Sequence, residues 1–470
     1  MNPSRIPSAA PVLTGAVLAL TATVLLVVGL VWLVRYLRAD AATRTSIRQA
    51  RRIQRGWPRL ARNLALATTD HTPTLLQNLT TTADLNSRKP EPRILVPSIS
   101  TTADRFGVLV HLRTVPRIGL AEVQRHAEHL ADAWRCTRVS VNPDGPGRLL
   151  LRAVRDEPLL EPLAFIPDGL PPKDLAVWDL GIDEYATAVV LRMANVPGMC
   201  VAGLPGYGKT SLISSLISRL APSGSVQFAV ADGKVSAAHE GDYADVIDRL
   251  FAFVGDDLEA ANVLFARLVK LRRDRSSCIR SVLGTTNVWH HGPSPAWPLV
   301  VLVIDEAHTY FRDYKGADPA TRRLAQLTAD NARLVEDLVK KGRNVGIVVV
   351  LATQKATGDA IPTYIRDVCP ISLSFAQKTS EAAVAALGED IRNWPDTSPV
   401  GMQDPGFVGV ATMVRQGAEG FTRVRTPYVD PRHLARTARD SAHLTADPAH
   451  LLNALQRPDL RKSADPAPAA

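Results

Sequence analysis

Cysteine is scarce in this sequence, and none of its cysteines lie close together. The 470 residues contain four, with no CxxC pair, at Cys136, Cys200, Cys278 and Cys369. Zinc frameworks and disulfide scaffolds need cysteines at short spacing, so this pattern excludes both and favours reduced, buried thiols in a cytosolic body. Two histidines, His126 and His129, stand three residues apart in an expected helix. No further metal ligand lies near them in the sequence, so we interpret them as surface residues.

Outside one segment, the chain has almost no excess of positive over negative charge. The chain has a formal net charge of +9, and residues 35–62 hold nine arginines against one acid, Asp40, which gives +8 for that segment alone. The rest of the chain is therefore close to neutral. The nine are Arg35, Arg38, Arg44, Arg48, Arg51, Arg52, Arg55, Arg59 and Arg62. Both anionic lipid headgroups and DNA phosphates are compatible ligands for such a cluster.

One long uncharged run precedes these arginines. Residues 12–34 carry no charge over 23 positions, and as a helix they would span about 35 Å, enough to cross a bilayer core of about 30 Å. A cleaved signal peptide is the competing interpretation, but the run exceeds a usual signal core and lacks a clear A-x-A site. We therefore predict a transmembrane helix. Only Arg5 precedes it, so the positive-inside rule predicts a single-pass protein of the cell membrane with a cytoplasmic C-terminal body.

The next part of the chain suggests a linker and then a small domain. Residues 35–98 are expected to form a basic juxtamembrane segment followed by a linker rich in Thr, Pro and Asn. A small α/β domain is expected over 99–160, with a strand in 105–115 and a helix in 119–135. Two further strand-like runs, separated by the turn "NPDGPG", complete a β-α-β-β order.

A larger domain is expected over residues 161–430, after a proline-rich break. Its repeated strand, loop and helix patterns are typical of a mostly parallel sheet covered by helices. We interpret residues 1–11 as an N-terminal tail and residues 431–470 as a C-terminal tail whose end is disordered.

The stretch "GLPGYGKTS" (203–211) follows a short apolar run and opens an expected helix. Its spacing fits a P-loop, in which glycines let backbone N–H groups wrap the β-phosphate of a nucleotide. Lys209 would reach the β- and γ-phosphates of ATP, and the Thr210 hydroxyl would bind Mg²⁺. The residues expected to bind the nucleotide are Gly203, Leu204, Pro205, Gly206, Tyr207, Gly208, Lys209, Thr210 and Ser211.

Two later strands supply the polar groups that ATP hydrolysis needs. In "VVLVIDEAHTYF" (300–311) a fully apolar run ends at Asp305 and Glu306. Asp305 would hold Mg²⁺ through water, and Glu306 would polarise the attacking water as a general base. A further strand ends at Gln354, where polar residues fall on the ligand side of the sheet and could sense the γ-phosphate. These residues predict an ATPase.

From about Leu180 to Asp430, the order of segments resembles the FtsK/SpoIIIE-type DNA translocases. Besides the P-loop, the resemblance rests on "FAVADGK" (228–234), similar to a strand ending in D-P-K, and on "KGRNVGIVVVLATQ" (341–354). Gly233 stands where that family has proline. With an N-terminal anchor, a small α/β module and a single motor, the chain looks like the TraB-type conjugal transfer proteins of actinobacterial mobile elements.

Motifs and resemblance together predict an α/β protein, with a single RecA-like P-loop motor domain preceded by a small α/β domain and one transmembrane helix. The resemblance implies a homo-hexameric ring that uses ATP to pump double-stranded DNA, for conjugal transfer of a plasmid or integrative element. A protein-export motor, of the type VII or type IV coupling-protein kind, is the alternative because such ATPases have similar cores.

The resemblance also implies further site residues. Asp232 and Lys234 would lie near the nucleotide. A catalytic arginine from a neighbouring subunit usually completes such a ring site, and we expect Arg343 in this role, with Arg322, Arg323 and Arg366 as alternatives. Six basic residues between positions 267 and 280 offer contacts to DNA phosphates, or form a solvated helix face.

Overall fold

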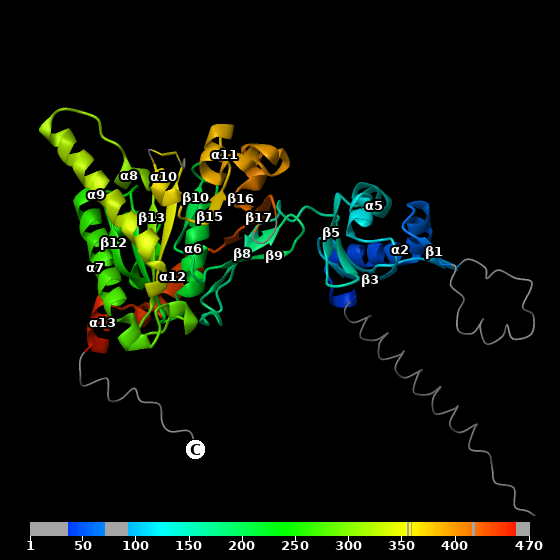
Figure 1. The fold of residues 1–470 in the computed structure, drawn as a ribbon, viewed down its shortest axis with the longest axis horizontal. Helices are drawn as coiled ribbons and strands as arrows, with labels where there is room; N and C mark the ends of the chain where they lie inside the picture. Colours follow the sequence, from blue (N-terminus) through cyan, green and yellow to red (C-terminus); the bar gives the residue numbers. More distant parts are fainter. Residues whose placement is uncertain (1–35, 71–92, 355–356, 359, 416–418, 457–470) are drawn as a thin grey trace, which may run out of the picture. The chain divides into compact units, whose positions relative to one another are not determined.

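The computed structural model describes residues 36–70, 93–354, 357–358, 360–415 and 419–456 (Figure 1). The chain divides between Glu157 and Pro158 into two compact units. The tail expected over 1–11 and the transmembrane helix predicted over 12–34 lie outside the described residues. Within the described ranges, no helix is both long and apolar enough to span a bilayer.

The first unit contains a four-stranded antiparallel sheet in the order β3-β4-β6-β5. The strands are β3 (Ser98–Asp104), β4 (Gly107–Arg113), β5 (Arg138–Pro143) and β6 (Arg148–Val154). The helix expected over 119–135 is present as two short helices, α4 (Leu120–Gln124) and α5 (Ala127–Trp134). Alternate strand residues such as Val108 and Leu151 pack against Leu130 of α5 in one core.

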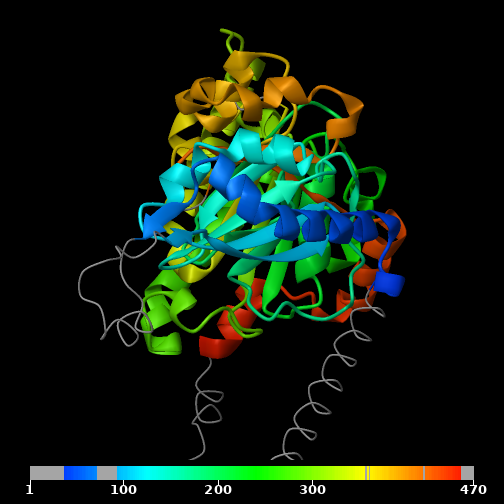
Figure 2. The ribbon, with the colours of Figure 1, turned by 90° about the vertical axis from the view of Figure 1, so that its right-hand side faces the viewer.

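A 23-residue helix, α2 (Ala41–Asn63), also belongs to this unit. Its buried face includes Ile53, Trp57 and Ala61, and α2, blue in Figure 2, packs on β3 and β4. Trp57 Nε1 donates a hydrogen bond to Pro97 O at 2.6 Å. The sequence interpretation expects a basic juxtamembrane segment and a linker over 35–98, and it did not predict this packed helix over residues 41–63. Apolar residues at four-residue spacing form a helix face there, which the surrounding arginines obscure in the sequence.

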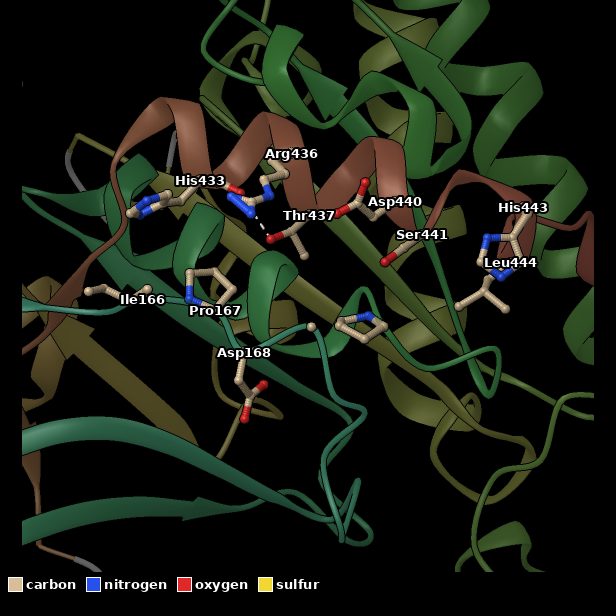
Figure 3. A pocket seen from close by; sticks show the side chains of 12 residues that line it. Ile166, Pro167, Asp168, His433, Arg436, Thr437, Asp440, Ser441, His443 and Leu444 are labelled. Carbon is tan, nitrogen blue, oxygen red and sulfur yellow. Dashed lines mark hydrogen bonds between the residues drawn. The ribbon is translucent and has the colours of Figure 1, made fainter.

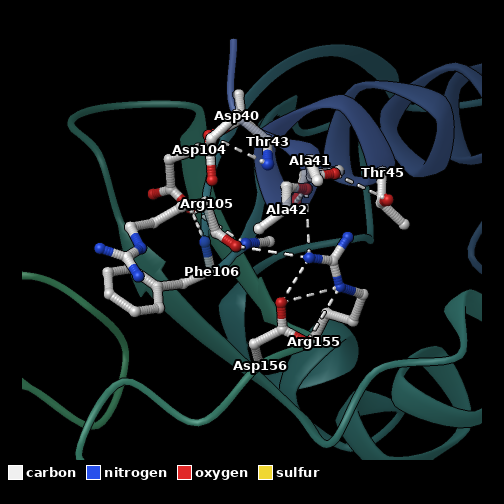
Figure 4. Close-up of polar contacts among 12 residues, drawn as sticks. Asp40, Ala41, Ala42, Thr43, Thr45, Asp104, Arg105, Phe106, Arg155 and Asp156 are labelled. Carbon is white, nitrogen blue, oxygen red and sulfur yellow. Dashed lines mark hydrogen bonds and ion pairs between the residues drawn. The ribbon is translucent and has the colours of Figure 1, made fainter. Parts of the chain in front are cut away.

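Polar contacts fix the start of α2 (Figure 4). Asp40 caps the helix by accepting a hydrogen bond from Thr43 N at 3.4 Å. Arg155, directly after β6, donates from Nη2 to Ala42 O at 3.2 Å and forms an ion pair with Asp156. A two-stranded ladder of β1 (Thr68–Asp70) and β2 (Arg93–Leu95) follows α2 along the chain. The helix is thus held to the unit at its first turn as well as along its buried face.

The second unit contains a ten-stranded mixed sheet in the order β12-β11-β13-β14-β10-β15-β16-β17-β8-β9. The first six strands in this order pair in parallel. They are β10 (Gly198–Ala202), β11 (Val226–Asp232), β12 (Leu250–Val254), β13 (Leu299–Asp305), β14 (Ile347–Thr353) and β15 (Ile371–Ser374).

The other four strands pair antiparallel, so the expectation of a mostly parallel sheet holds for only one part of it. They are β8 (Val177–Asp183), β9 (Ala188–Arg192), β16 (Val410–Val414) and β17 (Phe421–Arg425). Connection length explains two of these pairings, since only antiparallel neighbours can be joined by the few residues that separate β8 from β9 and β16 from β17. A short parallel pair, β7 (Leu163–Ala164) and β18 (Pro427–Tyr428), lies apart from this sheet.

Helices cover both faces of the sheet. On one face lie α6 (Lys209–Leu220) and α12 (Pro431–Asp440), and on the other α7 (Leu258–Leu283), α9 (Pro319–Lys341) and α13 (Pro448–Gln456). The short helices are α8 (His308–Phe311), α10 (Thr363–Arg366) and α11 (Ser380–Leu387). Along β13, Val301 and Val303 enter the first core while Val300 and Leu302 enter the second, which explains why this strand is apolar throughout.

The C-terminal tail expected over 431–470 is corrected for residues 431–456. Leu434 and Ala438 of α12 and Leu452 of α13 are buried in the cores of the second unit. These apolar residues recur at helical spacing, which outweighs the polar composition of the segment. Residues 457–470, where a disordered end is expected, lie outside the described residues.

Candidate functional site

The P-loop occupies the sharp turn between β10 and α6. Gly203 and Gly208 have φ angles of 150° and 112°, conformations that side chains with a Cβ rarely adopt. A Cβ at Gly203 would lie 2.6 Å from Phe375 Cβ, so this position also lacks space for one. Since α6 begins at Lys209, the unpaired N–H groups of its first turn face the loop and favour an anion there.

Lys209 is folded back onto this loop. Its Nζ donates hydrogen bonds to Gly203 O at 2.6 Å and Leu204 O at 3.1 Å, and the residue is only 5% exposed. Burial lowers the pKa of Lys209, although the nearby charge of Asp305 opposes that shift. The predicted phosphate-binding lysine therefore lies inside the loop that would surround the phosphates.

Strand order brings the predicted catalytic residues to the same edge of the sheet. β14 lies between β10 and β13, so the carboxyl ends of the P-loop strand, the strand of Asp305 and the strand of Gln354 are adjacent. β11 pairs with β13 so that Asp232 is opposite Asp305. Open α/β sheets bind ligands at this edge.

Asp305 is the fully buried centre of a polar cluster. Its Oδ2 accepts hydrogen bonds from Lys234 Nζ at 2.9 Å, Tyr243 OH at 3.0 Å and Thr210 Oγ1 at 3.4 Å. Thr210 Oγ1 also lies 3.4 Å from Asp242 Oδ2. Thr210 and Asp305, predicted from motifs far apart in the sequence, are therefore in contact.

These oxygens fit a Mg²⁺ ion. A hydroxyl and two carboxylates are hard oxygen donors, and Mg²⁺ is usually bound by one or two carboxylates together with water and nucleotide phosphates. In the part of the chain that the structure describes, no group of three or more His, Cys, Asp or Glu side chains could hold a metal ion by itself. When a nucleotide is bound, its phosphates would supply further oxygen ligands to a metal at Thr210 and Asp305.

Glu306 and Gln354 form a second pair at this edge. Gln354 Nε2 donates to Glu306 Oε2 at 3.2 Å. Glu306 has a φ of 52°, a left-handed conformation that costs a residue with a Cβ about 1 kcal/mol or more and that often occurs at functional sites. The turn directs Glu306 out of the buried strand, and Gln354 orients its carboxylate.

Asp232 lies at the same edge of the sheet, and its side chain stabilises the turn that follows β11. Its Oδ1 accepts a hydrogen bond from Lys234 N at 3.1 Å, which positions the Lys234 side chain toward Asp305. Burial raises the pKa of Asp232 to about 6, and the neighbouring Asp305 adds to the rise. Burial by itself would lower the pKa of Lys234. The carboxylate of Asp305 outweighs this effect, so the pKa of Lys234 is raised.

Two site residues, Asp242 and Tyr243, were missed by the sequence interpretation. They stand at the start of a 3₁₀ segment after β11 rather than at a strand end, and no motif marks them. Tyr207 of the P-loop has a structural partner as well. Its hydroxyl donates to Gln403 O, and its carbonyl accepts from Gly409 N at 3.0 Å. The aromatic residue in the loop therefore ties the P-loop to the segment before β16.

Arg343 is not near the site of its own chain. It precedes β14, at the end opposite Gln354, and the seven residues of that strand extend about 20 Å. Its exposed side chain contacts Asn344 Oδ1 at 3.3 Å. Of the alternatives, Arg323 pairs with Glu259 at the surface, Arg322 is exposed on the same helix, and Arg366 ends α10.

The basic stretch on α7 is divided between structural and exposed residues. Arg275 is 1% exposed and donates to Val345 O and Pro298 O, both at 2.9 Å, with its guanidinium 5.1 Å from the centre of the Trp297 ring. Burial lowers the pKa of Arg275 to about 9. Arg272 is buried too, and its Nε donates to Asp337 at 2.9 Å. These two arginines hold α7 in place and leave only the exposed members for a DNA contact.

A separate cavity of about 470 Å³ lies at the other end of α6, where Pro222 follows the helix. Figure 3 shows its lining from the segment around Asp168 and from α12, including His433 and Arg436. Because the P-loop is at the first residue of α6, this cavity is distinct from the nucleotide site.

Comparisons with known proteins agree with this site. The AAA domain family matches residues 197–355, the span from β10 to the end of β14. The chain is 26% identical over 232 residues to a DNA translocase FtsK from Leptospira interrogans, covering 46% of this chain and 22% of that protein. It is 25% identical over 315 residues to a DNA translocase FtsK from Lactiplantibacillus plantarum, covering 59% and 37%. The chain thus spans well under half the length of these relatives.

Two solved structures are similar to parts of this chain. One is the pCW3 conjugation coupling protein TcpA with ATPgS, at 16% identity and a TM-score of 0.48, covering 76% of this chain and 93% of that chain. The other is the cytoplasmic domain of the type VII secretion ATPase EccC from Thermomonospora curvata, at 18% identity and a TM-score of 0.45, covering 63% and 34%.

Fold and site together define a P-loop ATPase. Within that class, the matches to the translocases confirm the resemblance to the FtsK/SpoIIIE type that the motifs indicate.

Proposed function

We propose that this protein is a membrane-anchored motor that uses ATP hydrolysis to move double-stranded DNA, in conjugal transfer of a plasmid or integrative element of the TraB type. The observation that carries the proposal is the assembly, at one sheet edge, of the P-loop with Asp305, Glu306 and Gln354, in a chain related to DNA translocases.

The chemistry follows from the positions of these side chains. P-loop N–H groups and Lys209 would bind the β- and γ-phosphates, and Thr210 and Asp305 would hold Mg²⁺, which neutralises phosphate charge when bound. Glu306 would accept the proton of the attacking water, and Gln354 would keep its carboxylate oriented through the 3.2 Å hydrogen bond.

A homo-hexameric ring with an arginine supplied in trans is part of the proposal. Arg343 lies at the end of the sheet opposite its own P-loop. In a ring, its side chain would contact the nucleotide bound by a neighbouring subunit. DNA contacts in such a motor must be independent of sequence, so phosphate binding by exposed basic residues is the expected mode. On α7, Lys270, Arg273 and Arg280 are exposed, and Lys270 is paired with Asp274 at 2.6 Å.

Membrane placement is supported by the charge pattern that follows the uncharged run over 12–34. In α2, exposed arginines fall within an arc of about 100° at 3.6 residues per turn, opposite the buried face of the helix. They are Arg48, Arg51, Arg52, Arg55, Arg59 and Arg62. Such a stripe matches anionic headgroups at the cytoplasmic leaflet.

ATPase assays with and without duplex DNA test the motor. We expect DNA to stimulate hydrolysis, and Lys209→Ala to abolish it by removing the phosphate-binding ammonium. Stimulation by a secreted polypeptide with no response to DNA would support the export alternative instead.

Membrane extraction tests the anchor separately. The wild-type chain should require detergent and resist alkaline carbonate, whereas a Leu20→Arg/Leu25→Arg variant should be released by carbonate because the span is interrupted by charge. Release of the wild-type chain by carbonate alone would contradict the anchor and leave the motor proposal unaffected.

A further inference from the structure

Lys234 contacts the Asp305 oxygen that is assigned to Mg²⁺, and it lies beside a second carboxylate, that of Asp242. Its Nζ lies 2.9 Å from Asp305 Oδ2 and 3.5 Å from Asp242 Oδ2. Thr210 Oγ1 lies 3.4 Å from each of those two oxygens. An ammonium and a metal ion cannot both occupy this space, because both would need Asp305 Oδ2 and their charges repel.

The fold determines where this lysine lies. Lys234 follows β11 by two residues, and the hydrogen bond from its N–H to Asp232 Oδ1 fixes the turn that directs the side chain toward Asp305. Asp305 is 0% exposed, and a buried carboxylate is costly without a cation beside it. Lys209 does not fill that role, since its Nζ is bonded to the carbonyls of Gly203 and Leu204.

We propose that Lys234 is a built-in counter-cation for Asp305, which holds the metal position in the nucleotide-free enzyme and yields it to Mg²⁺ when the nucleotide arrives. The proposal rests on the metal ligands assigned in the proposed function. The Lys234 side chain is 30% exposed and Asp242 is 56% exposed, so the lysine has a flexible route outward and a second carboxylate to contact. Metal binding is thereby coupled to nucleotide binding, and the free enzyme does not trap divalent cations at Asp305.

Electron paramagnetic resonance of Mn²⁺ with the full chain, in the absence of nucleotide, tests this. The variant Lys234→Met should bind one Mn²⁺ about tenfold or more tightly than the wild type, because the competing charge is gone. Lys234→Arg keeps the charge and should bind as weakly as the wild type. Lys340→Met, which removes a lysine paired with Glu336 at the surface, is the matched control and should also resemble the wild type.

Adding Asp305→Asn to Lys234→Met should abolish the tight Mn²⁺ site. Equal affinity of the wild type and Lys234→Met, or tight binding by Lys234→Arg, would overturn the proposal. The metal assignment is tested separately by Mn²⁺ binding with an ATP analogue. If Asp305→Asn does not weaken that binding, the proposed function loses its metal site. If it does, and only the nucleotide-free result fails, the role of Lys234 alone is wrong.

Discussion

Gln354 and Glu306, at the ends of two adjacent strands, are joined by a hydrogen bond of 3.2 Å from Gln354 Nε2 to Glu306 Oε2. Glu306 also has a left-handed φ of 52°, so two independent features set the direction of its carboxylate. One comes from the turn after β13 and the other from β14, and a change at either strand end alters where a proton acceptor would stand.

Glu306→Gln should lower kcat by a factor of about 10² to 10⁴, the usual contribution of a general base, while leaving nucleotide binding intact. Gln354→Ala should cost about tenfold, because the base remains and only one hydrogen bond is lost. Steady-state hydrolysis and titration with a fluorescent ATP analogue measure the two quantities. A wild-type rate in Glu306→Gln would assign the base elsewhere.

Asp232→Asn should change how stability depends on pH. The pKa of Asp232 is raised from 3.8 to about 6, mainly by burial, so the folded state holds this proton more tightly than the unfolded chain does. The group therefore destabilises the fold as pH rises from about 4 to about 6, by at most about 3 kcal/mol, and the loss persists above that range. The Asn variant keeps an oxygen for Lys234 N and avoids the loss.

Urea unfolding at pH 4 and pH 7 checks this prediction. The free energy of unfolding of Asp232→Asn, relative to the wild type, should increase between the two pH values. A difference that is the same at both would contradict a raised pKa.

Arg275→Ala should destabilise the second unit by about 3 kcal/mol or more, because it leaves buried carbonyls unpaired and a cavity beside Trp297. Arg273→Ala, two residues away and exposed, is the matched control and should stay within about 0.5 kcal/mol of the wild type. Thermal unfolding of both variants gives the comparison, and similar melting temperatures would refute the structural role of Arg275.

Arg273→Ala serves a different test on DNA. If this arginine contacts a phosphate, the slope of the logarithm of the binding constant against the logarithm of salt concentration should become shallower by about 0.9. An unchanged slope would make the exposed face of α7 a solvated surface.

Trp57→Ala should unfold the first unit, at a cost of about 3–5 kcal/mol for a large buried side chain. Arg59→Ala, exposed on the same helix, should have little effect. Limited proteolysis after each substitution should give cleavage within the first unit only for Trp57→Ala, with the second unit remaining intact. Cleavage spread over both units would contradict a domain boundary at Glu157.

The nucleotide site was predictable because each of its motifs is local in sequence, although the motifs themselves are far apart. A strand, a glycine turn and a lysine at a helix start occur within a dozen positions, and the strand ends of Asp305 and Gln354 must share the edge of a parallel sheet. Asp242 and Tyr243 were not predictable, since they reach Thr210 and Asp305 by tertiary folding of a 3₁₀ segment without regular periodicity.

Charge in the sequence was a poor guide to exposure. On α2, an arginine-rich pattern forms an exposed stripe. On α7, a similar pattern includes Arg275, which is buried. The carbonyls that bind Arg275 belong to Val345 and Pro298, 70 and 23 residues away, so only the assembled fold distinguishes the two cases. The apolar face of α2 was overlooked for a related reason, because arginines separate Ile53 from Trp57 and Ala61.

Tyr207 gives the P-loop a mechanical connection that a glycine-rich loop does not have by itself. Its hydroxyl and carbonyl are bonded to Gln403 and Gly409, and the chain enters β16 directly after Gly409. A change in the backbone conformation of the P-loop on phosphate binding would therefore also displace the segment that leads into β16. Through Tyr207, a movement of the P-loop would be transmitted to β16, which belongs to the antiparallel part of the sheet.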